Sequence, residues 1–263
     1  MVRYFAKGPA ILTWHEVWHD EWRSYEGFGK LGKEIEYIVS KLGWNKHVVV
    51  SNFTADRLCR FNNISRKKVR VIFNGVGDEF FGQNTKQEGK IVFVGRLVPQ
   101  KHAHDLLLDA FIEAKRINND LTLHIIGDGV CLPIIKERSK DMDDVHVYGK
   151  VSQETLVNHI KSSSVLCLPS EREGLGIVAL EAMAAGIPVV TTNFPLNATA
   201  YDVVKTGFNG FVVNPDSKDI AEGILKANRQ LKTLTKNCSQ FASNFSWDKV
   251  AEQTEQLYSE LIG

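Results

Sequence analysis

Short apolar, β-branched runs alternate with longer segments of helical periodicity along most of this chain. Six runs follow one another from residue 90 onward: Ile91–Val94, Leu121–Ile126, Val145–Tyr148, Val165–Leu168, Pro188–Thr191 and Phe211–Val213. Segments with helical spacing, such as Ala103–Ile117 and Ser152–Lys161, lie between most of them. This alternation predicts a parallel, doubly wound α/β sheet. Ligands of such sheets bind beyond the carboxyl ends of the strands, so functional residues are expected in the loops there.

The first part of the chain predicts a second, smaller α/β unit. Strands are expected at Ala10–Trp14, His47–Val50 and Val69–Phe73. A long helix is expected near Glu21–Leu42 and a short one near Ala55–Phe61. The polar, turn-rich stretch 74–89 that follows predicts an interdomain linker.

Composition narrows the functional classes. Hydrophobic residues make up 43% of the chain, which is enough for a sizeable core. Lys and Arg total 32 against 31 Asp and Glu, so the formal net charge is +1. This balance excludes the uniformly basic surface typical of a nucleic-acid-binding protein, and no nucleic acid partner is expected. An anionic ligand must therefore be held by local charges.

Four cysteines are scattered without a C-x-x-C pair: Cys59, Cys131, Cys167 and Cys238. This pattern argues against a zinc ribbon, a thioredoxin-type site or a disulfide framework, and it suits a reducing cytosol. The longest uncharged stretch, Ala182–Tyr201, is broken by glycine and proline and so cannot cross a membrane as a helix. We expect a cytoplasmic protein and leave open peripheral contact with the inner face of the membrane.

The strongest local signal follows the apolar run that ends at Leu168. The sequence SEREGLGIVALEAMAAGIP, residues 170–188, predicts a glycine loop and then a helix that ends near Gly186. Gly174 and Gly176 let the backbone approach a ligand closely. The free N–H groups at the start of such a helix bind anions such as phosphate.

Two carboxylates, Glu173 and Glu181, bracket this element. If the whole interval were helical, they would lie about 12 Å apart along its axis. That spacing suits the two hydroxyl-rich ends of a nucleotide sugar, because carboxylates accept hydrogen bonds from vicinal hydroxyls. The alternative is a solvated loop charge at Glu173 and a helix-dipole contact at Glu181.

A second signal is IVFVGRLVPQK, residues 91–101, in which a strand ends at Gly95 and is followed by Arg96 and Lys101. A guanidinium binds phosphate oxygens in a bidentate manner and an ammonium adds a point charge. Together they can neutralise a diphosphate. The plainer alternative is a surface Arg and Lys after a strand.

In combination, these motifs resemble the donor half of the retaining glycosyltransferases of family 4, also described as glycosyl transferases group 1. The resemblance is carried by Gly95-Arg96-Leu97 with Lys101, by Ile126-Gly127-Asp128-Gly129 and by Glu173-x7-Glu181. It extends to Asn74-Gly75-Val76, which resembles the interdomain crossing of that family. Gln100, where an acid is common, and His102, where a small residue often follows the lysine, depart from the pattern.

The resemblance implies an α/β fold of the GT-B type. Residues 82–244 would form the complete Rossmann-like C-terminal donor domain, and residues 1–81 a partial Rossmann-like N-terminal domain. Residues 245–263 would form a helix that returns toward the N-terminal domain. Family members usually carry further residues before the strand at Ala10–Trp14, so the chain is expected to lack the first part of that domain.

The resemblance also implies the roles of individual residues. Arg96 and Lys101 match the pair that binds the diphosphate, while Glu173 matches the acid on the donor sugar and Glu181 the acid on the ribose. The expected catalytic residues are Glu173, Arg96, Lys101 and His15. The expected donor-binding residues are Gly95, Arg96, Lys101, Gly127, Tyr148, Lys150, Val151, Glu173, Gly174, Leu175, Gly176, Ile177 and Glu181.

The implied reaction transfers a sugar, with retention, from a UDP- or GDP-linked donor to a saccharide or lipid-linked acceptor. No metal or cofactor is required, because cations at the leaving group supply the electrostatic stabilisation. The first alternative is a nucleotide-binding module that is inactive without a partner chain that completes the N-terminal domain. A nucleotide-sugar epimerase of the same fold is a weaker alternative.

A competing motif lies near the N-terminus. His15-Glu16-Val17-Trp18-His19 has the H-E-x-x-H spacing that, on a helix, places two zinc ligands on one face. Because Ala10–Trp14 predicts a strand rather than a helix, a zinc hydrolase is only a remote alternative. In the resembled family a Thr-x-His-Glu stretch occurs at this point, and its histidine faces the donor sugar, which implies that role for His15.

Three tryptophans, Trp14, Trp18 and Trp22, recur at every fourth position and would form one aromatic stripe on a helix. Packing in the core is the favoured interpretation. Contact with a membrane surface that carries a lipid-linked acceptor is the alternative.

Overall fold

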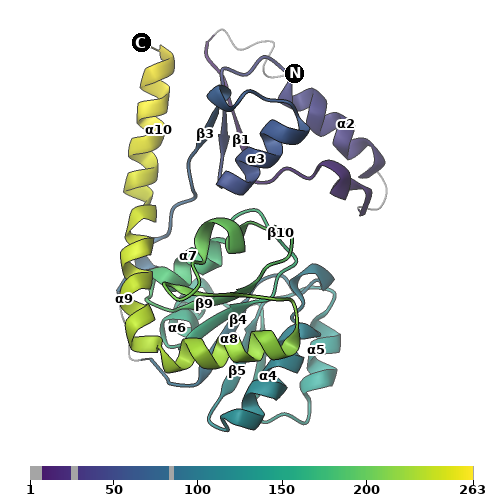
Figure 1. The fold of residues 1–263 in the computed structure, drawn as a ribbon, viewed down its shortest axis with the longest axis vertical. Coiled ribbons are helices and arrows are strands. Elements are labelled where there is room, and N and C mark those ends of the chain that lie inside the picture. Colours follow the sequence, from purple (N-terminus) through teal and green to yellow (C-terminus); the bar gives the residue numbers. More distant parts are fainter. Residues whose placement is uncertain (1–7, 25–28, 83–85, 263) are drawn as a thin grey trace. The chain divides into compact units, whose positions relative to one another are not determined.

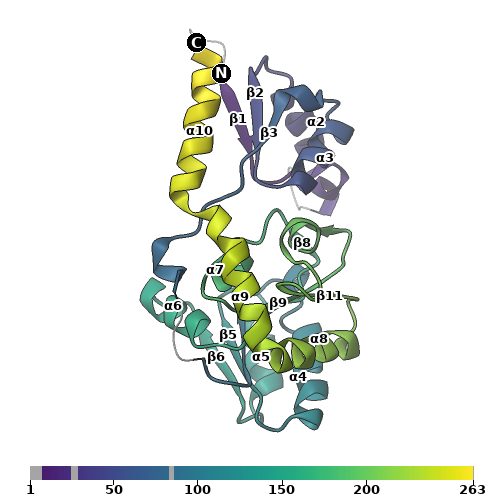
Figure 2. The same ribbon diagram turned by 60° about the vertical axis from the view of Figure 1, so that its left-hand side comes forward.

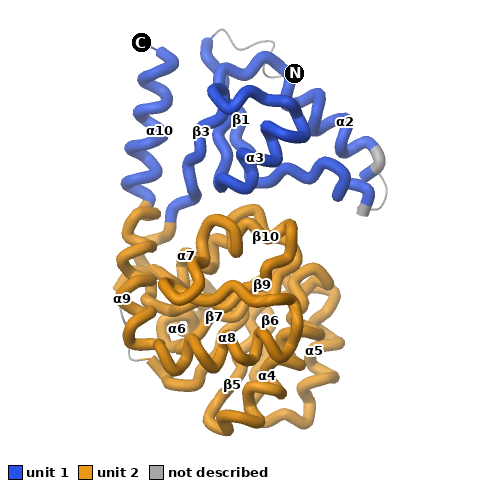
Figure 3. Tube along the Cα trace, viewed as in Figure 1, with its two compact units in different colours: residues 1–75, 247–263 blue, residues 76–246 orange. Residues whose placement is uncertain are grey.

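The structure is a computed structural model, and it describes residues 8–24, 29–82 and 86–262. The chain divides into two compact units (Figure 3). Unit 1 comprises Met1–Gly75 and Trp247–Gly263, and unit 2 comprises Val76–Ser246. The first boundary therefore falls within the polar stretch 74–89.

Unit 2 is built on a six-stranded sheet (Figure 1). Its strands are β4 (Lys90–Val94), β5 (Thr122–Ile126), β6 (Val145–Gly149), β7 (Val165–Leu168), β9 (Val189–Thr192) and β11 (Gly210–Val213). They lie in the order β11-β9-β7-β4-β5-β6, and all neighbours pair in parallel. The chain thus starts at β4, winds outward through β5 and β6, and then winds the other way through β7. The loops after β4 and β7 flank this change of direction, which is where such sheets bind ligands.

Six α-helices of unit 2 connect these strands or follow them: α4 (Leu106–Ile117), α5 (Leu132–Ser139), α6 (Gln153–Lys161), α7 (Ile177–Ala184), α8 (Ser217–Arg229) and α9 (Leu231–Ala242). Helices α4 and α8 pack together, and α7 packs against α6 and α9, so that the sheet lies between two layers (Figure 2). Every residue of β7 and β9 is buried, as expected for the central strands of a covered parallel sheet.

Short elements of unit 2 complete the surroundings of the sheet. They are the 3-10 helices η3 (Asp78–Phe80), η4 (Pro99–Lys101) and η6 (Ser243–Phe245), and the π-helix η5 (Thr199–Val203). A separate two-stranded parallel sheet joins β8 (Arg172–Glu173) to β10 (Leu196–Asn197). The periodicity of the sequence did not predict this small sheet, because neither strand is long enough to show an apolar alternation.

Unit 1 holds a three-stranded parallel sheet in the order β1-β2-β3. The strands are β1 (Ile11–Trp14), β2 (Lys46–Val49) and β3 (Val69–Val71), and the α-helices are α2 (Gly29–Ser40), α3 (Asn52–Phe61) and α10 (Trp247–Ile262). Two apolar clusters form here. The larger one packs Val49 against Leu58 of α3, and the other packs Val48 and Ile72 against Leu257 of α10.

The long helix expected near Glu21–Leu42 is not one helix. A 3-10 helix, η1 (His19–Ser24), precedes α2, and residues 25–28 between them lie outside the described part of the chain. Gly29 is the first residue of α2, and a glycine at this position weakens a helix that would continue from η1.

The three tryptophans also do not share one helical face. Trp14 ends β1, Trp18 lies before η1 and Trp22 lies within η1. The Trp14 indole is buried and donates to His47 Nδ1 at 3.0 Å, and the Trp22 indole donates to Glu36 at 2.9 Å. The Trp18 and Trp22 rings lie 5.2 Å apart, so each of the three rings has a partner within unit 1.

The structure confirms the predicted α/β fold with parallel sheets. It also confirms the strand, glycine loop and helix predicted around residues 165–186, since β7 is followed by a loop and by α7. In the described part of the chain, no helix combines the length and the apolar character needed to cross a membrane.

Candidate functional site

The loops after β4 and β7 bring a cation and a carboxylate together. Lys101, at the end of η4, places its Nζ 2.5 Å from Glu173 Oε1 and 3.1 Å from the carbonyl oxygen of Arg172. The two side chains are 13% and 15% exposed, so little solvent screens their attraction. Two of the predicted site residues, 72 positions apart in the sequence, are thus in direct contact.

A buried amide fixes the backbone that carries Glu173. Asn197 of β10 pairs with Glu173 of β8, and its side chain, which is 2% exposed, donates to the carbonyl oxygens of Ser170 at 3.1 Å and Thr192 at 2.8 Å. Its Oδ1 accepts from the Thr199 amide at 3.1 Å. Sequence reasoning missed Asn197, and its only signal was a polar residue within the uncharged stretch 182–201.

The glycine loop turns into α7 at Gly176, as the sequence predicted. Gly176 has a φ of 78°, and a Cβ at this position would collide with Thr199 Oγ1. That hydroxyl in turn donates to the carbonyl oxygen of Leu175 at 3.0 Å. Since no side chain caps α7, the N–H groups of its first turn, which begins at Ile177, can meet an anion. Gly174 lies between this turn and Glu173.

The second predicted acid, Glu181, lies in the middle of α7 and is partly buried. Its burial, and secondarily the nearby carboxylate of Glu79, raise its pKa to about 7. Glu79 belongs to η3, and Gln153 of α6 donates to it at 3.2 Å. The interval between Glu173 and Glu181 is not helical throughout, because the helix begins only after Gly176.

Backbone contacts tie the loops after β4, β5 and β6 to one another. The amide of Gly95 donates to Ile126 at 3.1 Å, and that of Gly127 donates to Gly149 at 2.9 Å. Gly127 has a φ of 145°, and a Cβ there would overlap the carbonyl oxygen of Gly95. Glycine is therefore required for this close approach.

Arg96 directly follows Gly95 and is exposed. Within the described ranges its guanidinium makes no hydrogen bond or ion pair with another side chain. A guanidinium that is already free of protein partners can bind an anion without first breaking a contact.

Three of the expected donor-binding residues, Tyr148, Lys150 and Val151, lie at the end of β6 or directly after it. Tyr148 is 41% exposed, and its hydroxyl lies 2.9 Å from Nδ1 of His124. Its ring also contacts that of His159 of α6, with centroids 4.4 Å apart. Lys150 is exposed and Val151 partly buried. The Tyr148 side chain is thus held among histidines.

His15 belongs to unit 1, where it follows β1 and is exposed. The residues from His15 to Trp18 are not helical, so His15 and His19 do not share the helical face that a zinc-binding H-E-x-x-H motif needs. His19 pairs instead with Asp20, at 3.0 Å. No group of three His, Cys, Asp or Glu side chains able to hold a metal ion is found in residues 8–24, 29–82 and 86–262.

Comparison with known proteins identifies relatives of both parts of the chain. Residues 88–229 match the family model for glycosyl transferases group 1, and residues 1–80 match that for Glycosyltransferase Family 4. An uncharacterized glycosyltransferase of Methanocaldococcus jannaschii is 30% identical over 223 residues, or 82% of this chain and 60% of that protein. The O-antigen chain mannosyltransferase RfbU of Salmonella typhimurium is 26% identical, with the same coverage of 82% and 60%. The chain spans about 60% of the length of these relatives.

Solved structures show the same fold. HepE of Anabaena, crystallised in complex with UDP and glucose, matches with a TM-score of 0.79 and 18% identity over 96% of this chain and 72% of that chain. Sucrose-phosphate synthase from Thermosynechococcus elongatus matches with a TM-score of 0.79 and 21% identity over 99% and 69%. These matches show that the fold is of the GT-B type.

Proposed function

Because this chain belongs to the family of glycosyl transferases group 1, we propose that it transfers a sugar from a nucleotide-diphosphate donor to a saccharide or lipid-linked acceptor. The observation that carries the proposal is the contact between Lys101 and Glu173 at the change of winding direction of the unit 2 sheet. A cation for a diphosphate and an acid for sugar hydroxyls lie there side by side. The relatives described as glycosyltransferases support the same class of reaction.

The donor diphosphate would lie between Arg96, Lys101 and the first turn of α7. Each cation about 4 Å from a phosphate charge contributes on the order of 4 kcal/mol at an effective dielectric constant near 20, before desolvation is subtracted. The N–H groups from Gly174 to Ile177 add fixed dipoles that do not reorganise as the leaving group departs. The cations and amides thus stabilise the charge that develops on the departing diphosphate.

The two acids would hold the two sugars of the donor. Glu173 would accept hydrogen bonds from the transferred sugar, and Glu181 from the ribose hydroxyls. When the phosphate binds, the N–H groups of the Lys101 ammonium must be shared between Glu173 and the phosphate. Glu173, and the sugar that it holds, then lie beside the leaving group. Tyr148, Lys150 and Val151 would line the base, Gly127 would belong to the same donor site, and His15 would contact the transferred sugar.

We also propose that the anomeric configuration is retained, with departure and attack on one face of the sugar, and that no metal takes part. Arg96 and Lys101 support a reaction without a metal, because they supply the positive charge that a metal provides in other transferases. The four cysteines are free, which supports a reaction in the reducing cytoplasm.

The test is to incubate the full chain with UDP-glucose, UDP-N-acetylglucosamine or GDP-mannose and a panel of glycosides, and to follow the products by mass spectrometry and NMR. An α-linked product from an α-linked donor supports the proposal, and an inverted product contradicts retention. Nucleotide binding without transfer, under all these conditions, would favour the alternative of a nucleotide-binding module. Isomerisation of the donor without transfer would favour an epimerase.

A further inference from the structure

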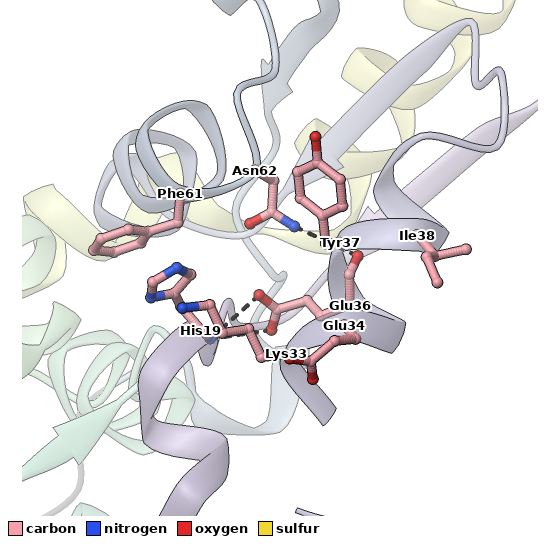
Figure 4. A pocket seen from close by; sticks show the side chains of 8 residues that line it. All are labelled: His19, Lys33, Glu34, Glu36, Tyr37, Ile38, Phe61 and Asn62. Atoms are coloured by element: carbon pink, nitrogen blue, oxygen red, sulfur yellow. Dashed lines mark hydrogen bonds between the residues drawn. The ribbon is translucent and has the colours of Figure 1, made fainter. Parts of the chain in front are cut away.

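A cavity of about 290 Å³ lies within unit 1, and none of the residues predicted to bind the donor lines it (Figure 4). It opens to solvent and is lined by residues of η1, α2 and the end of α3. Its lining residues are His19, Lys33, Glu34, Glu36, Tyr37, Ile38, Phe61 and Asn62. Its volume is at the small end of the range of cavities that hold small molecules.

The floor of the cavity is a buried carboxylate in a fixed position. Glu36 is 7% exposed and accepts from the amide of Trp18 at 2.7 Å, the amide of His19 at 3.2 Å and the indole of Trp22 at 2.9 Å. Three N–H donors from η1 and the residues before it therefore hold the carboxylate in place. The Glu36 oxygens are thus already engaged, and the side chains around them expose mostly apolar atoms to the cavity.

A second acceptor lies beside this carboxylate, and no donor for it is found among the described residues. Asn62 is 1% exposed, and its Nδ2 donates to the backbone carbonyl of Glu36 at 3.4 Å. Its Oδ1 is buried and finds no hydrogen-bond donor within the part of the chain that the structure describes. Figure 4 shows this oxygen on the side of Asn62 that faces Phe61 and His19. Buried acceptors are nearly always hydrogen-bonded, so this one points to a ligand that brings a donor.

Aromatic rings form part of the cavity wall. The imidazole of His19 stacks on Phe61, with centroids 4.2 Å apart and an angle of 17° between the planes. His19 has a φ of 49°, a conformation that is uncommon for a residue other than glycine and that is often found at binding sites. Tyr37 and Ile38, which are 48% and 58% exposed, form the mouth.

These features select one class of ligand. An anion is disfavoured, because Glu34 and Glu36 line the cavity and the ammonium of Lys33 is paired with Asp20 at 2.8 Å. A plain hydrocarbon is disfavoured, because it would leave Asn62 Oδ1 unpaired. A neutral sugar ring meets both requirements, since its C–H face packs on aromatic rings and its hydroxyls donate to acceptors.

We propose that this cavity binds one neutral pyranose ring of a saccharide. The inference rests on the proposed function, because such a saccharide would be part of the acceptor. Since α3 connects the parallel strands β2 and β3, it runs antiparallel to them, and its last residue, Phe61, lies toward their amino ends. Phe61 and Asn62 thus reach the cavity from the side of these amino ends, whereas His19 comes from the connection that follows the carboxyl end of β1.

The test is saturation-transfer-difference NMR of the full chain with methyl α-D-glucopyranoside, methyl α-D-mannopyranoside and octyl β-D-glucopyranoside. Tyr37→Ala and Asn62→Ala are compared with Ile35→Ala, which alters an exposed residue of the same helix outside the cavity. We expect a signal from the sugar protons of at least one methyl glycoside. Tyr37→Ala should weaken its binding about tenfold, and Ile35→Ala should leave it unchanged.

Three results would overturn the inference. They are no signal from either methyl glycoside, equal binding by the wild type and both cavity variants, and a signal confined to the octyl chain, which would assign the cavity to a lipid. Tyr37→Ala keeps the test valid if Asn62→Ala fails to fold, since Tyr37 is exposed. Thermal stabilisation by UDP or GDP, measured on the same samples, reports the donor site and so separates failure of this inference from failure of the proposed function.

Discussion

The ammonium of Lys101 lies 2.5 Å from the carboxylate of Glu173 and links the loop after β4 to the loop after β7. A second link, from the Glu171 amide to the Gln100 carbonyl oxygen at 2.8 Å, joins the same two loops. The two loops are therefore held in fixed positions relative to each other before any ligand binds. A diphosphate that reaches Lys101 competes with Glu173 for the same ammonium, so binding of the donor and placement of its sugar are coupled.

The first prediction concerns Lys101. We expect UDP or GDP to raise the melting temperature of the wild-type chain and Lys101→Ala to abolish that rise, because the cation that contacts the phosphate is gone. Without ligand, the variant should lose about 2 kcal/mol of unfolding free energy, since Glu173 loses a charged partner. Differential scanning fluorimetry and chemical denaturation measure the two effects separately.

Lys140→Ala is the matched control, because Lys140 forms an exposed ion pair with Glu137 in the same unit. It should keep the response to nucleotide. If Lys101→Ala also keeps the full response, Lys101 does not bind the diphosphate.

The second prediction concerns Gly127. Replacement by alanine places a methyl group against the carbonyl oxygen of Gly95 in a conformation that alanine rarely adopts. The loss of unfolding free energy should be about 2 kcal/mol or more. Nucleotide affinity should also fall, because the methyl group displaces Gly95 and Arg96 directly follows it. Gly207, whose φ is 78° and which has open space around it, gives the control. Gly207→Ala should lower the unfolding free energy less than Gly127→Ala does and should leave nucleotide affinity unchanged. Equal effects of the two substitutions would refute the packing argument.

The third prediction follows from the pKa of Glu181. Burial, and then Glu79, raise this pKa from an ordinary value of 4.5 to about 7. Between these values the folded protein keeps a proton that the unfolded chain releases, so the stability from this group is complete below pH 4.5 and is lost as the pH rises through 7. The difference in unfolding free energy between Glu181→Gln and the wild type should therefore shift in favour of the variant from pH 5 to pH 8. Urea denaturation at the two pH values measures this difference, and an equal effect at both would contradict it.

The fourth prediction concerns His47 in unit 1. Burial first, and then the charges of Lys68 and Lys41, lower the pKa of His47 to about 4, and its Nδ1 accepts a hydrogen bond from Trp14. The unfolded chain binds a proton near pH 6.5, so the stability from neutral His47 is present above that pH and is lost as the pH falls toward 4. His47→Gln should make the unfolding free energy of unit 1 depend less on pH.

Tryptophan fluorescence measures the effect on unit 1 alone, since all five tryptophans lie in its two segments. Urea denaturation followed by this signal at pH 7.5 and pH 5 should show a smaller difference for His47→Gln than for the wild type. A variant with the same difference as the wild type would exclude His47 as the titrating group.

Local patterns predicted much of the fold. The apolar runs of unit 2 coincide with its strands, and the glycines and alanines of residues 174–186 predicted the turn and α7. The cations after β4 and the acids around α7 could be proposed as one site, because a parallel sheet brings the carboxyl ends of its strands to one edge.

Local sequence patterns could not predict contacts between residues that are far apart in the sequence. The hydrogen bonds of Asn197 to Ser170 and Thr192 depend on a two-residue strand pair with no periodicity of its own. The cavity of unit 1 depends on Phe61 and Asn62, at the end of α3, meeting His19 across unit 1. His19 was noticed in the sequence only as part of an apparent zinc motif.

A crystal structure with UDP or GDP bound tests the central claim most directly. The account predicts that the diphosphate lies between the Arg96 guanidinium, Lys101 Nζ and the first N–H groups of α7, with the ribose on Glu181. A nucleotide bound elsewhere, with the pair of Lys101 and Glu173 undisturbed and no phosphate near Arg96, would contradict it.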